Sequence, residues 1–422
     1  MKNHKKWLFA AFCLICFAVN IGAESAPPSI DEITARAAVI MDAATGDILF
    51  AKNPDELIPP ASLTKLMTIY AAQRLAALQG TSLDEVVPLP PESWAVNQPP
   101  RSSLMFLAQG QIVTLRELFL GLAVPSGNDA AVAVALRFAP TVEKFAAVMN
   151  GEAARMGLRQ TRFVEPSGID ENNITTAAEF AAFCRTYILE YPQNLTDYHT
   201  VPEFAYPKAS NVTGAQRSRP GTILQGNHIS IISIYEGADG LKTGYIDEAG
   251  YNLAATAQRD GTRLIAVILG VPAELGPRYG DRARTEDARK LLDYGYENYK
   301  TLRLELPALA EAKVWKGRQN RVPVLVAPRS RAGGNAVVYS ADGNVLALTI
   351  SAGRGEEAYI ETAYNTGVRA PFPAGAPVGT LTVYDGEGEL AVIDLLAGAP
   401  VERAGLVKRF FHSIAMFLRG IK

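Results

Sequence analysis

Hydrophobic residues recur at helical spacing through much of the first 300 residues of this 422-residue chain. The repeat predicts helices at 63–78, 115–122, 129–138, 142–156 and 281–299. Runs of apolar and β-branched residues before and after the central helices predict strands at 37–42, 48–50, 224–234, 251–257 and 263–270. Glycines at 157 and 168 separate the segments. We therefore expect an α+β domain whose sheet is assembled from both ends of this region.

Beyond residue 300 the pattern changes to short alternating runs joined by glycine-containing turns. Asp342-Gly343-Asn344 separates the runs 336–339 and 345–350, and a similar turn at 385–388 separates 381–384 from 390–393. These arrangements are typical of β-hairpins. The region is predicted to be a small, sandwich-like all-β domain, and it contains no recognisable chemical motif.

The last segment, 401–422, has a third pattern. Large apolar residues stand at spacings of three and four, at Leu406, Phe410, Ile414, Phe417 and Ile421. Cations stand among them, at Lys408, Arg409, Arg419 and Lys422. The segment is predicted to be an amphipathic helix that lies in a membrane surface, and packing against the body of the protein is the alternative.

The N-terminus carries Lys2, Lys5 and Lys6 ahead of an apolar run that ends before Glu24. This order is typical of a secretory signal peptide, with a retained anchor helix as the alternative. The expected organisation is a signal peptide at 1–23, a catalytic domain at 24–299, an all-β domain at 300–400 and the amphipathic helix at 401–422. The protein is therefore expected on the outer face of the cytoplasmic membrane or in the periplasm.

Composition narrows the chemistry. The 41 basic and 43 acidic residues give a formal net charge of -2 with no long basic run, which argues against nucleic acid as a partner. The four histidines are too scattered to show metal-ligand spacing, so we expect no metal ion or cofactor. Cys184 lies in a helical pattern and is expected to be a buried thiol with no catalytic role.

Ser62 stands at the start of the first predicted helix, and Lys65 follows three residues later. Residues three apart share a helix face, so the amine lies within reach of the hydroxyl. A lysine can activate a serine where burial or another cation lowers the pKa of its amine. The helix N-terminus also offers N–H groups to a developing oxyanion. Taken alone, however, the pair is more often an N-cap serine followed by a solvated lysine.

Two further patterns occur once each after the signal segment. Ser126-Gly127-Asn128 is typical of a turn before a helix. Lys242-Thr243-Gly244 is predicted to open a strand, where the glycine would let a substrate backbone approach closely. In the order Ser-x-x-Lys, Ser-x-Asn, Lys-Thr-Gly, the three motifs are those shared by penicillin-binding proteins and serine β-lactamases. The predicted catalytic residues are Ser62, Lys65 and Ser126, and the predicted substrate-binding residues are Asn128, Lys242, Thr243, Gly244 and Tyr245.

The sequence resembles the low-molecular-mass penicillin-binding proteins, specifically the serine-type D-alanyl-D-alanine carboxypeptidases. The matching segments include Pro60-Ala-Ser-Leu-Thr-Lys-Leu-Met-Thr, Ser126-Gly-Asn-Asp-Ala, Asp239-Gly-Leu-Lys-Thr-Gly-Tyr and Glu248-Ala-Gly-Tyr-Asn-Leu. The resemblance covers about 33–295, and the β-rich segment is similar to the family's C-terminal domain. It implies a β-lactamase/transpeptidase-like catalytic domain.

The resemblance also implies a reaction. Ser62 would attack the carbonyl of the penultimate D-alanine of a peptidoglycan stem peptide and expel the terminal D-alanine, after which water hydrolyses the acyl-enzyme. Lys65 would be the base for acylation, and Ser126 with Lys242 would pass the proton to the leaving amine. β-Lactam antibiotics would be inhibitors.

The remaining implied roles concern substrate binding. Asn128 would hold the substrate amide and Lys65, and Thr243 with Lys242 would hold the terminal carboxylate. The backbone N–H groups of Ser62 and Tyr245 would form the oxyanion hole.

Two positions depart from the family pattern. Ile246 stands where the family often has threonine, and Asn227-His228-Ile229 stands where it has Asn-Arg-Asn. His228 is interpreted first as a hydrogen-bonded structural histidine. Asp129 is interpreted first as a cap at the start of its helix.

Three alternative functions remain open at this point. A class A β-lactamase would add a Glu-x-x-Leu-Asn motif, which the sequence lacks. A DD-endopeptidase would use the same residues on peptide crosslinks. A wall-binding scaffold with a decayed site is the alternative outside enzymes, and the intact motifs argue against it.

Overall fold

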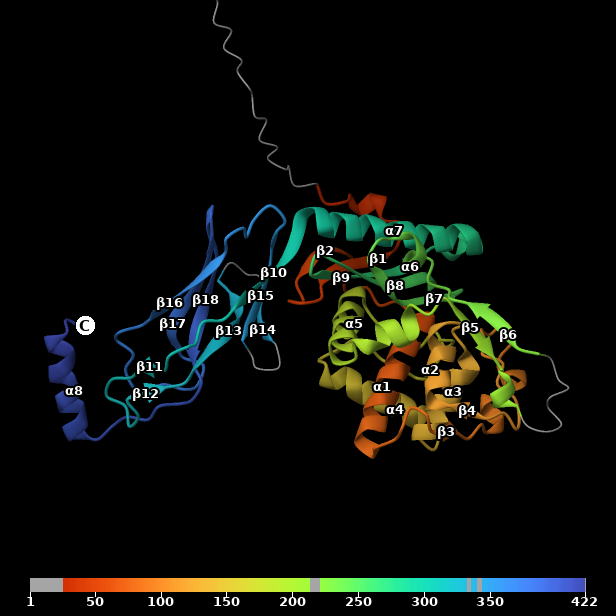
Figure 1. The fold of residues 1–422 in the computed structure, drawn as a ribbon, viewed down its shortest axis with the longest axis horizontal. Coiled ribbons are helices and arrows are strands. Elements are labelled where there is room, and N and C mark those ends of the chain that lie inside the picture. Colours follow the sequence, from red (N-terminus) through yellow and green to blue (C-terminus); the bar gives the residue numbers. More distant parts are fainter. Residues whose placement is uncertain (1–25, 213–220, 332–334, 340–343, 422) are drawn as a thin grey trace, which may run out of the picture.

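The computed structural model describes residues 26–212, 221–331, 335–339 and 344–421. The predicted signal peptide at 1–23 lies outside these residues. Figure 1 shows a mixed helix-and-sheet region, an all-β region beside it, and one helix at the far end of the all-β region. The predicted fold class is confirmed.

The central sheet of the first region has five strands in the order β2-β1-β9-β8-β7, and every neighbouring pair is antiparallel. Two strands come from the N-terminal segment, β1 (Ala37–Asp42) and β2 (Ile48–Lys52). Three come from the end of the region, β7 (Ala238–Ile246), β8 (Gly250–Arg259) and β9 (Thr262–Val271). The expectation that both ends build one sheet is therefore confirmed. β7 lies at the edge.

Helices cover both faces of this sheet (Figure 1). One layer contains α1 (Thr64–Gln79), α2 (Leu115–Ala123), α3 (Asn128–Phe138), α4 (Val142–Arg155) and α5 (Ala177–Glu190). The other face is covered by α7 (Gly276–Asn298) and the short α6 (Ile231–Ile234). Two apolar cores follow, one on each side of the sheet. Cys184 is buried in the first core, as expected.

Three predicted elements differ in the structure. The run 224–234 is a short strand, β6 (Ile223–Gly226), followed by α6, so its β-branched residues form a helical turn where they pack against the sheet. α7 begins at Gly276 rather than 281, because Pro277 occupies the first turn, where its missing N–H costs nothing. Lys-Thr-Gly lies in the middle of β7 and does not open it.

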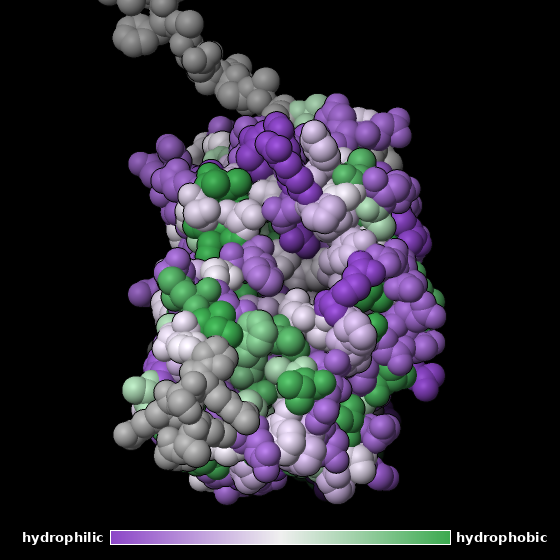
Figure 2. Space-filling view, turned by 90° about the vertical axis from the view of Figure 1, so that its right-hand side faces the viewer, coloured by the Kyte–Doolittle hydropathy of each residue, from purple (hydrophilic) through white to green (hydrophobic). Residues whose placement is uncertain are grey.

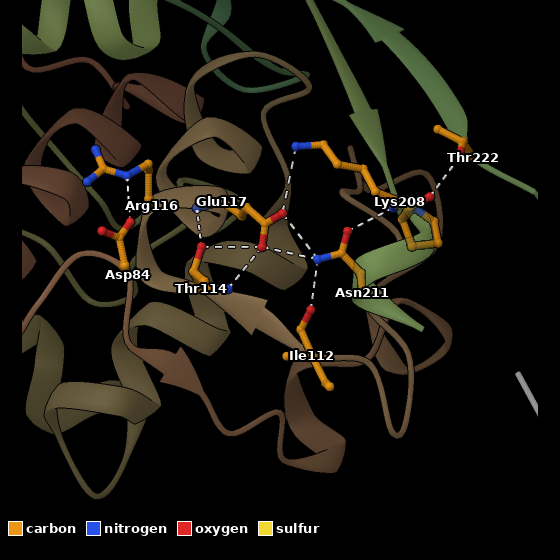
Figure 3. A network of polar contacts seen from close by, with 9 residues as sticks. Asp84, Ile112, Thr114, Arg116, Glu117, Lys208, Asn211 and Thr222 are labelled. Carbon is orange, nitrogen blue, oxygen red and sulfur yellow. Dashed lines mark hydrogen bonds and ion pairs between the residues drawn. The ribbon is translucent and has the colours of Figure 1, made fainter. Parts of the chain in front are cut away.

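The hairpin of β5 (Glu203–Tyr206) and β6 is tied to the helical layer by a polar network (Figure 3). Thr114 and Glu117 form a capping box at the start of α2. The Glu117 carboxylate also accepts from Asn211 Nδ2 at 3.1 Å, and the same amide donates to the Ile112 carbonyl at 2.8 Å. Lys208 Nζ lies 3.8 Å from Glu117. β3 (Val86–Val87) and β4 (Val113–Thr114) pair below it.

The all-β region contains β10 (Tyr299–Glu305), β11 (Ala312–Lys313), β12 (Arg321–Val322), β13 (Val324–Ser330), β14 (Ala336–Tyr339), β15 (Val345–Ser351), β16 (Tyr359–Tyr364), β17 (Pro377–Asp385) and β18 (Gly388–Ala397). A three-stranded sheet, β10-β15-β14, and a four-stranded sheet, β13-β18-β17-β16, share one apolar core. Asp42 links the two regions because its carboxylate accepts from Thr301 Oγ1 and Thr349 Oγ1, each at 2.9 Å.

The last helix, α8 (Leu406–Leu418), is shorter than predicted, because Val401 forms a β-bridge with Phe372. α8 packs on the all-β region through one face: Lys408 donates to the Arg318 carbonyl, the Lys316 N–H donates to His412 Nδ1, and Met416 is buried. The opposite face exposes Leu406, Val407, Phe410, Phe411, Ile414, Phe417 and Leu418. The helix thus packs on the protein and still presents an apolar face, and its attachment to a membrane stays a prediction. Within the described part of the chain, no helix is both long and apolar enough to cross a bilayer.

Candidate active site

The predicted nucleophile lies in a helical turn, Ala61–Leu63, that leads directly into α1. Lys65 Nζ lies 2.9 Å from Ser62 Oγ and donates to the Ser167 carbonyl at 2.6 Å. The Lys65 side chain is almost fully buried, whereas Ser62 reaches a cleft of about 280 Å³. The spacing of three residues therefore places the amine against the hydroxyl.

Burial lowers the pKa of Lys65 from its ordinary value of 10.5 to about 7, and the carboxylates of Glu165 and Asp129 partly oppose this shift. A substantial fraction of the amine is thus neutral near pH 7. A neutral amine within hydrogen-bond distance of a hydroxyl can take its proton. The pair has the geometry and the proton affinity of a nucleophile and its base.

A tight turn, 165–168, supplies the Ser167 carbonyl that accepts from the Lys65 amine. The Glu165 carboxylate accepts from the Ser167 N–H and hydroxyl, each at 2.6 Å, from the Gly168 N–H, and from Asn173 Nδ2 at 2.8 Å. These four bonds fix the turn so that the Ser167 carbonyl faces the amine. A Cβ at Gly168, which has a φ of +83°, would lie 1.8 Å from the Ala61 carbonyl oxygen, so only glycine fits there.

The second motif forms the opposite wall. Ser126 adopts a φ of +61°, and the motif leads into a helix as predicted, although α3 begins at Asn128, one residue before the predicted start. Asn128 Nδ2 donates to Ser102 Oγ at 3.3 Å, so the amide contacts the 100–103 loop rather than Lys65. A hydrogen bond between the Ser126 and Lys242 side chains is not found among the described residues.

The Asp129 carboxylate contacts both its own helix and a distant loop. Gly127 is the N-cap residue, but Asp129 accepts from the Ala130 N–H in the first turn of α3 at 2.9 Å, so the expected role at the helix start holds in part. The same carboxylate also accepts from the backbone N–H groups of Met105 and Leu107, at 2.8 and 2.9 Å. It thereby fixes the loop that contains Ser102 against α3. Burial raises the pKa of Asp129, and these amides oppose that shift.

The third motif lies on β7, the edge strand, which can present unpaired backbone groups to a ligand. Lys242 is almost fully buried and donates to the Thr243 carbonyl at 3.1 Å. Burial, Lys65 and Arg284 lower the pKa of Lys242 well below its ordinary value. Tyr245 is the exposed member and its hydroxyl donates to Asp247 at 2.6 Å.

Gly244 packs against the serine turn, and its approach to a substrate backbone stays a prediction. A Cβ on it would lie 2.8 Å from the Pro60 carbonyl oxygen and 3.0 Å from the Ser62 nitrogen. The missing side chain therefore makes room for the chain's own serine turn. This close contact brings the Ser62 and Tyr245 regions to the same cleft.

Two polar residues from distant segments hold these parts together. Arg284 of α7 donates to the carbonyls of Gly244 and Asn252, each at 3.1 Å. Asn252 Nδ2 donates to the Pro59 carbonyl at 2.9 Å, and its Oδ1 accepts from Gly270 N–H at 2.8 Å. β7, β8, β9 and the serine turn are thereby linked.

The two departures from the family pattern lie close to this site. Ile246 lines the cleft directly. His228 shows no hydrogen bond to its ring among the described residues, so the expected structural histidine is not supported. Partial burial, Lys242 and Arg284 lower the pKa of His228 to about 4.

The sequence reasoning missed several supporting residues, namely Arg101, Ser102, Glu165, Ser167, Asn173, Asn252 and Arg284. Arg101 lines the cleft, and the others make the contacts described above. One usable signal existed: Glu165-Pro-Ser-Gly168 is a turn sequence between helical segments. The partners of Asn252 and Arg284 that the text names lie between 18 and 193 residues away and leave no local pattern.

A serine that opens onto a cleft beside a neutralisable lysine can form and release an acyl group, so the fold and the site define a serine acyl-transfer enzyme. The sequence matches peptidase family S11, D-alanyl-D-alanine carboxypeptidase, over residues 22–273. It is 33% identical to the D-alanyl-D-alanine carboxypeptidase DacD of Escherichia coli over 82% of this chain and 88% of that protein. The chain therefore belongs to the D-alanyl-D-alanine carboxypeptidase family and is a serine peptidase.

Solved structures agree with this assignment. Penicillin-binding protein 5 from Haemophilus influenzae superimposes with a TM-score of 0.71 at 29% identity, covering 90% of this chain and all of that one. Penicillin-binding protein D2 from Listeria monocytogenes, solved in a cefotaxime-bound form, gives a TM-score of 0.52 at 27% identity, covering 63% of this chain and 98% of that one.

Proposed function

We propose that this protein removes the terminal D-alanine from peptidoglycan stem pentapeptides through an acyl-enzyme on Ser62, and that penicillins acylate the same hydroxyl. Lys65 takes the serine proton, and Ser126 with Lys242 returns a proton to the leaving amine. Asn128, Thr243, Gly244 and Tyr245 position the substrate. The 2.9 Å contact between Ser62 Oγ and a lysine whose pKa is about 7 carries the proposal.

The decisive experiment replaces Ser62 by Ala. D-Alanine release from a stem pentapeptide and covalent labelling by fluorescent penicillin should both disappear, because no other atom at that position can form the ester. Thr64→Ser is a matched control, since it alters a hydroxyl residue on the same turn outside the reaction. Labelling that persists without the Ser62 hydroxyl would overturn the assignment.

Glu165 argues against the β-lactamase alternative. A class A enzyme needs a carboxylate free to activate a deacylating water, whereas the Glu165 oxygens are occupied by three donors of their own turn and by Asn173 Nδ2. We therefore infer slow hydrolysis of the penicilloyl-enzyme. Release of D-alanine from a pentapeptide, measured beside release from a crosslinked dimer, distinguishes the carboxypeptidase from the endopeptidase.

We further propose that the protein is exported and attached to the outer face of the cytoplasmic membrane through α8. Phe417 and Leu418 are 84% and 76% exposed, and five other apolar residues extend the same face. Exposed apolar area of this size on a basic helix suits insertion into the headgroup region of a bilayer. The all-β region lies between α8 and the catalytic region and would hold the cleft away from the lipid (Figure 1).

Phe410→Ser combined with Phe417→Ser tests the attachment. Vesicle co-sedimentation should fall at least tenfold, because about 1.5–3 kcal/mol of apolar burial is lost with each ring. The free energy of unfolding should stay unchanged, since both rings face solvent in the folded protein. Leu224→Ser, at an exposed apolar residue on β6, is the control. Figure 2 shows the end of the molecule that carries β5 and β6, where hydrophilic and hydrophobic residues are mixed. Unchanged sedimentation of the double variant would refute the attachment.

A further inference from the structure

A pocket of about 660 Å³ lies where the end of α8 meets the all-β region. It is lined by Lys313 and Trp315, by residues 364–367 and by residues 419–421. All of them lie outside the serine site and its supporting residues. The pocket therefore has no part in the acyl-transfer chemistry.

Two cations meet at this pocket over a single indole ring. Lys313 Nζ lies 4.2 Å from the ring centre of Trp315, and the Arg419 guanidinium carbon lies 5.7 Å from it. Neither cation pairs with a carboxylate in the described part of the chain, and no acidic residue is among those that line the pocket. Two like charges that share one ring repel each other, and a bound anion would relieve that repulsion.

The aromatic groups favour an anion over a sugar. Trp315 is only 3% exposed, and its Nε1–H donates to the Thr366 carbonyl at 2.7 Å. The ring is thus buried and its N–H is paired, which leaves no open platform for stacking of a saccharide. The Tyr364 hydroxyl accepts from the Ala310 N–H at 2.9 Å and retains its own proton to donate to a ligand oxygen.

The carbonyl end of a helix disfavours an anion, and α8 ends beside this pocket. Two of its last carbonyls already accept hydrogen bonds, because Arg419 N–H and Ile421 N–H donate to Met416 and Gly420 N–H donates to Phe417. The positive φ of Gly420 permits this turn. The Arg419 and Lys313 charges therefore dominate the electrostatics of the pocket.

The position relative to the exposed face of α8 indicates the source of the anion. Phe417 and Leu418 directly precede Arg419 in the chain. Once these apolar side chains enter a bilayer, a cation one residue further along lies near the level of the lipid phosphates. Arg419 lies over the Trp315 ring beside Lys313, so both cations would meet a headgroup that enters the pocket.

We propose that this pocket binds the phosphate of an anionic phospholipid headgroup between Lys313 and Arg419, with the Tyr364 hydroxyl as a further donor. The inference rests on the proposed attachment through α8 and adds a lipid specificity to it. The apolar face would supply insertion, and the pocket would select phosphate among anionic headgroups.

Vesicle partitioning of the processed protein tests the proposal. One vesicle type contains phosphatidylglycerol in digalactosyldiacylglycerol, and the other contains a carboxylate-headgroup lipid in the same phosphate-free host, matched in zeta potential. Arg419→Gln is compared with Arg409→Gln, which removes an equal charge from the same helix outside the pocket. Both variants should bind the carboxylate vesicles about fivefold more weakly. On phosphatidylglycerol vesicles, the binding of Arg419→Gln should weaken by about a further tenfold. Lys313→Gln should show the same further loss of binding.

Equal losses for Arg419→Gln and Arg409→Gln on phosphatidylglycerol would overturn the pocket and leave the attachment standing. If the unsubstituted protein binds neither vesicle, the attachment fails. Titration with soluble dihexanoyl-phosphatidylglycerol, followed by tryptophan fluorescence, then decides the pocket separately. A saturable change that Arg419→Gln removes supports it, and no change overturns it. Equally tight binding of inorganic phosphate would reject the lipid as the source.

Discussion

The active site and the exposed face of α8 depart in opposite ways from the usual distribution of residues in a folded protein. At the active site, Lys65 and Lys242 are each only 1% exposed, although lysine is almost never fully buried. On α8, Phe410 and Phe417 are 64% and 84% exposed, although phenylalanine is usually inside. Each region is therefore less favourable for the isolated fold than an ordinary surface or core would be.

The two regions differ in where that unfavourable free energy is recovered. At the active site, the cost of burying polar groups is partly offset within the protein, because Ser167, Thr243 and Arg284 form hydrogen bonds with these groups or with the strand beside them. The desolvation that remains lowers the pKa values of the lysines. The apolar face of α8 has no covering partner among the described residues. This face can be stabilised only by contact with something outside the chain, so it indicates an interaction surface. The lysines with lowered pKa values indicate a site of reaction.

Replacing Lys65 by Met should change both the acylation rate and the free energy of unfolding, and it has the largest effect that we expect. The variant converts a buried cation into an apolar side chain of similar length. Acylation by penicillin should fall by about 10² to 10⁴ with the loss of the base. The free energy of unfolding should rise by about 1–4 kcal/mol at pH 7. Stopped-flow acylation and urea unfolding measure the two effects.

The pH dependence of that gain has a defined sign. The folded pKa of Lys65, about 7, lies below its ordinary value of 10.5, so the folded state is penalised wherever the unfolded lysine is charged. The stability gain of Lys65→Met should be largest below pH 7 and should vanish as pH approaches 10.5. Lys144→Met, on a helix far from the serine turn in sequence, is the control. A variant that keeps near-normal acylation would point to another base.

The parts of the site that the sequence predicts are those set by local geometry. Ser62 and Lys65 are three residues apart on one helical turn, so their contact follows from helix periodicity alone. The Ser126–Asn128 turn likewise precedes a helix. The strands 37–42 and 263–270 were predictable because alternating or continuous apolar runs leave few other options.

The parts that the sequence could not predict depend on long-range contacts. Asp129 contacts the first turn of its own helix, yet its carboxylate also accepts from a loop more than 20 residues earlier, which no local pattern predicts. Gly244 resembles a substrate-approach glycine, and only the packed structure shows the serine turn filling its space. The run 224–234 has strand propensity, but packing against the sheet makes part of it helical. Tertiary contacts decide in all three cases.

Glu165→Gln should produce a smaller effect, a shift in the pH dependence of acylation that shows how the protein sets the pKa of Lys65. The Glu165 carboxylate raises the pKa of Lys65 against the effect of burial, so its neutralisation should lower that pKa and leave more neutral amine in mild acid. The acylation rate at pH 6, relative to its plateau, should rise about two- to fivefold. The plateau itself should fall somewhat, because a glutamine cannot accept from all four donors, three in the 165–168 turn and one on Asn173. Glu171→Gln, at an exposed carboxylate of the same loop, should leave the profile unchanged. A merely structural role for Glu165 would lower the rate at every pH by one factor, so an unshifted acid limb would exclude the electrostatic role.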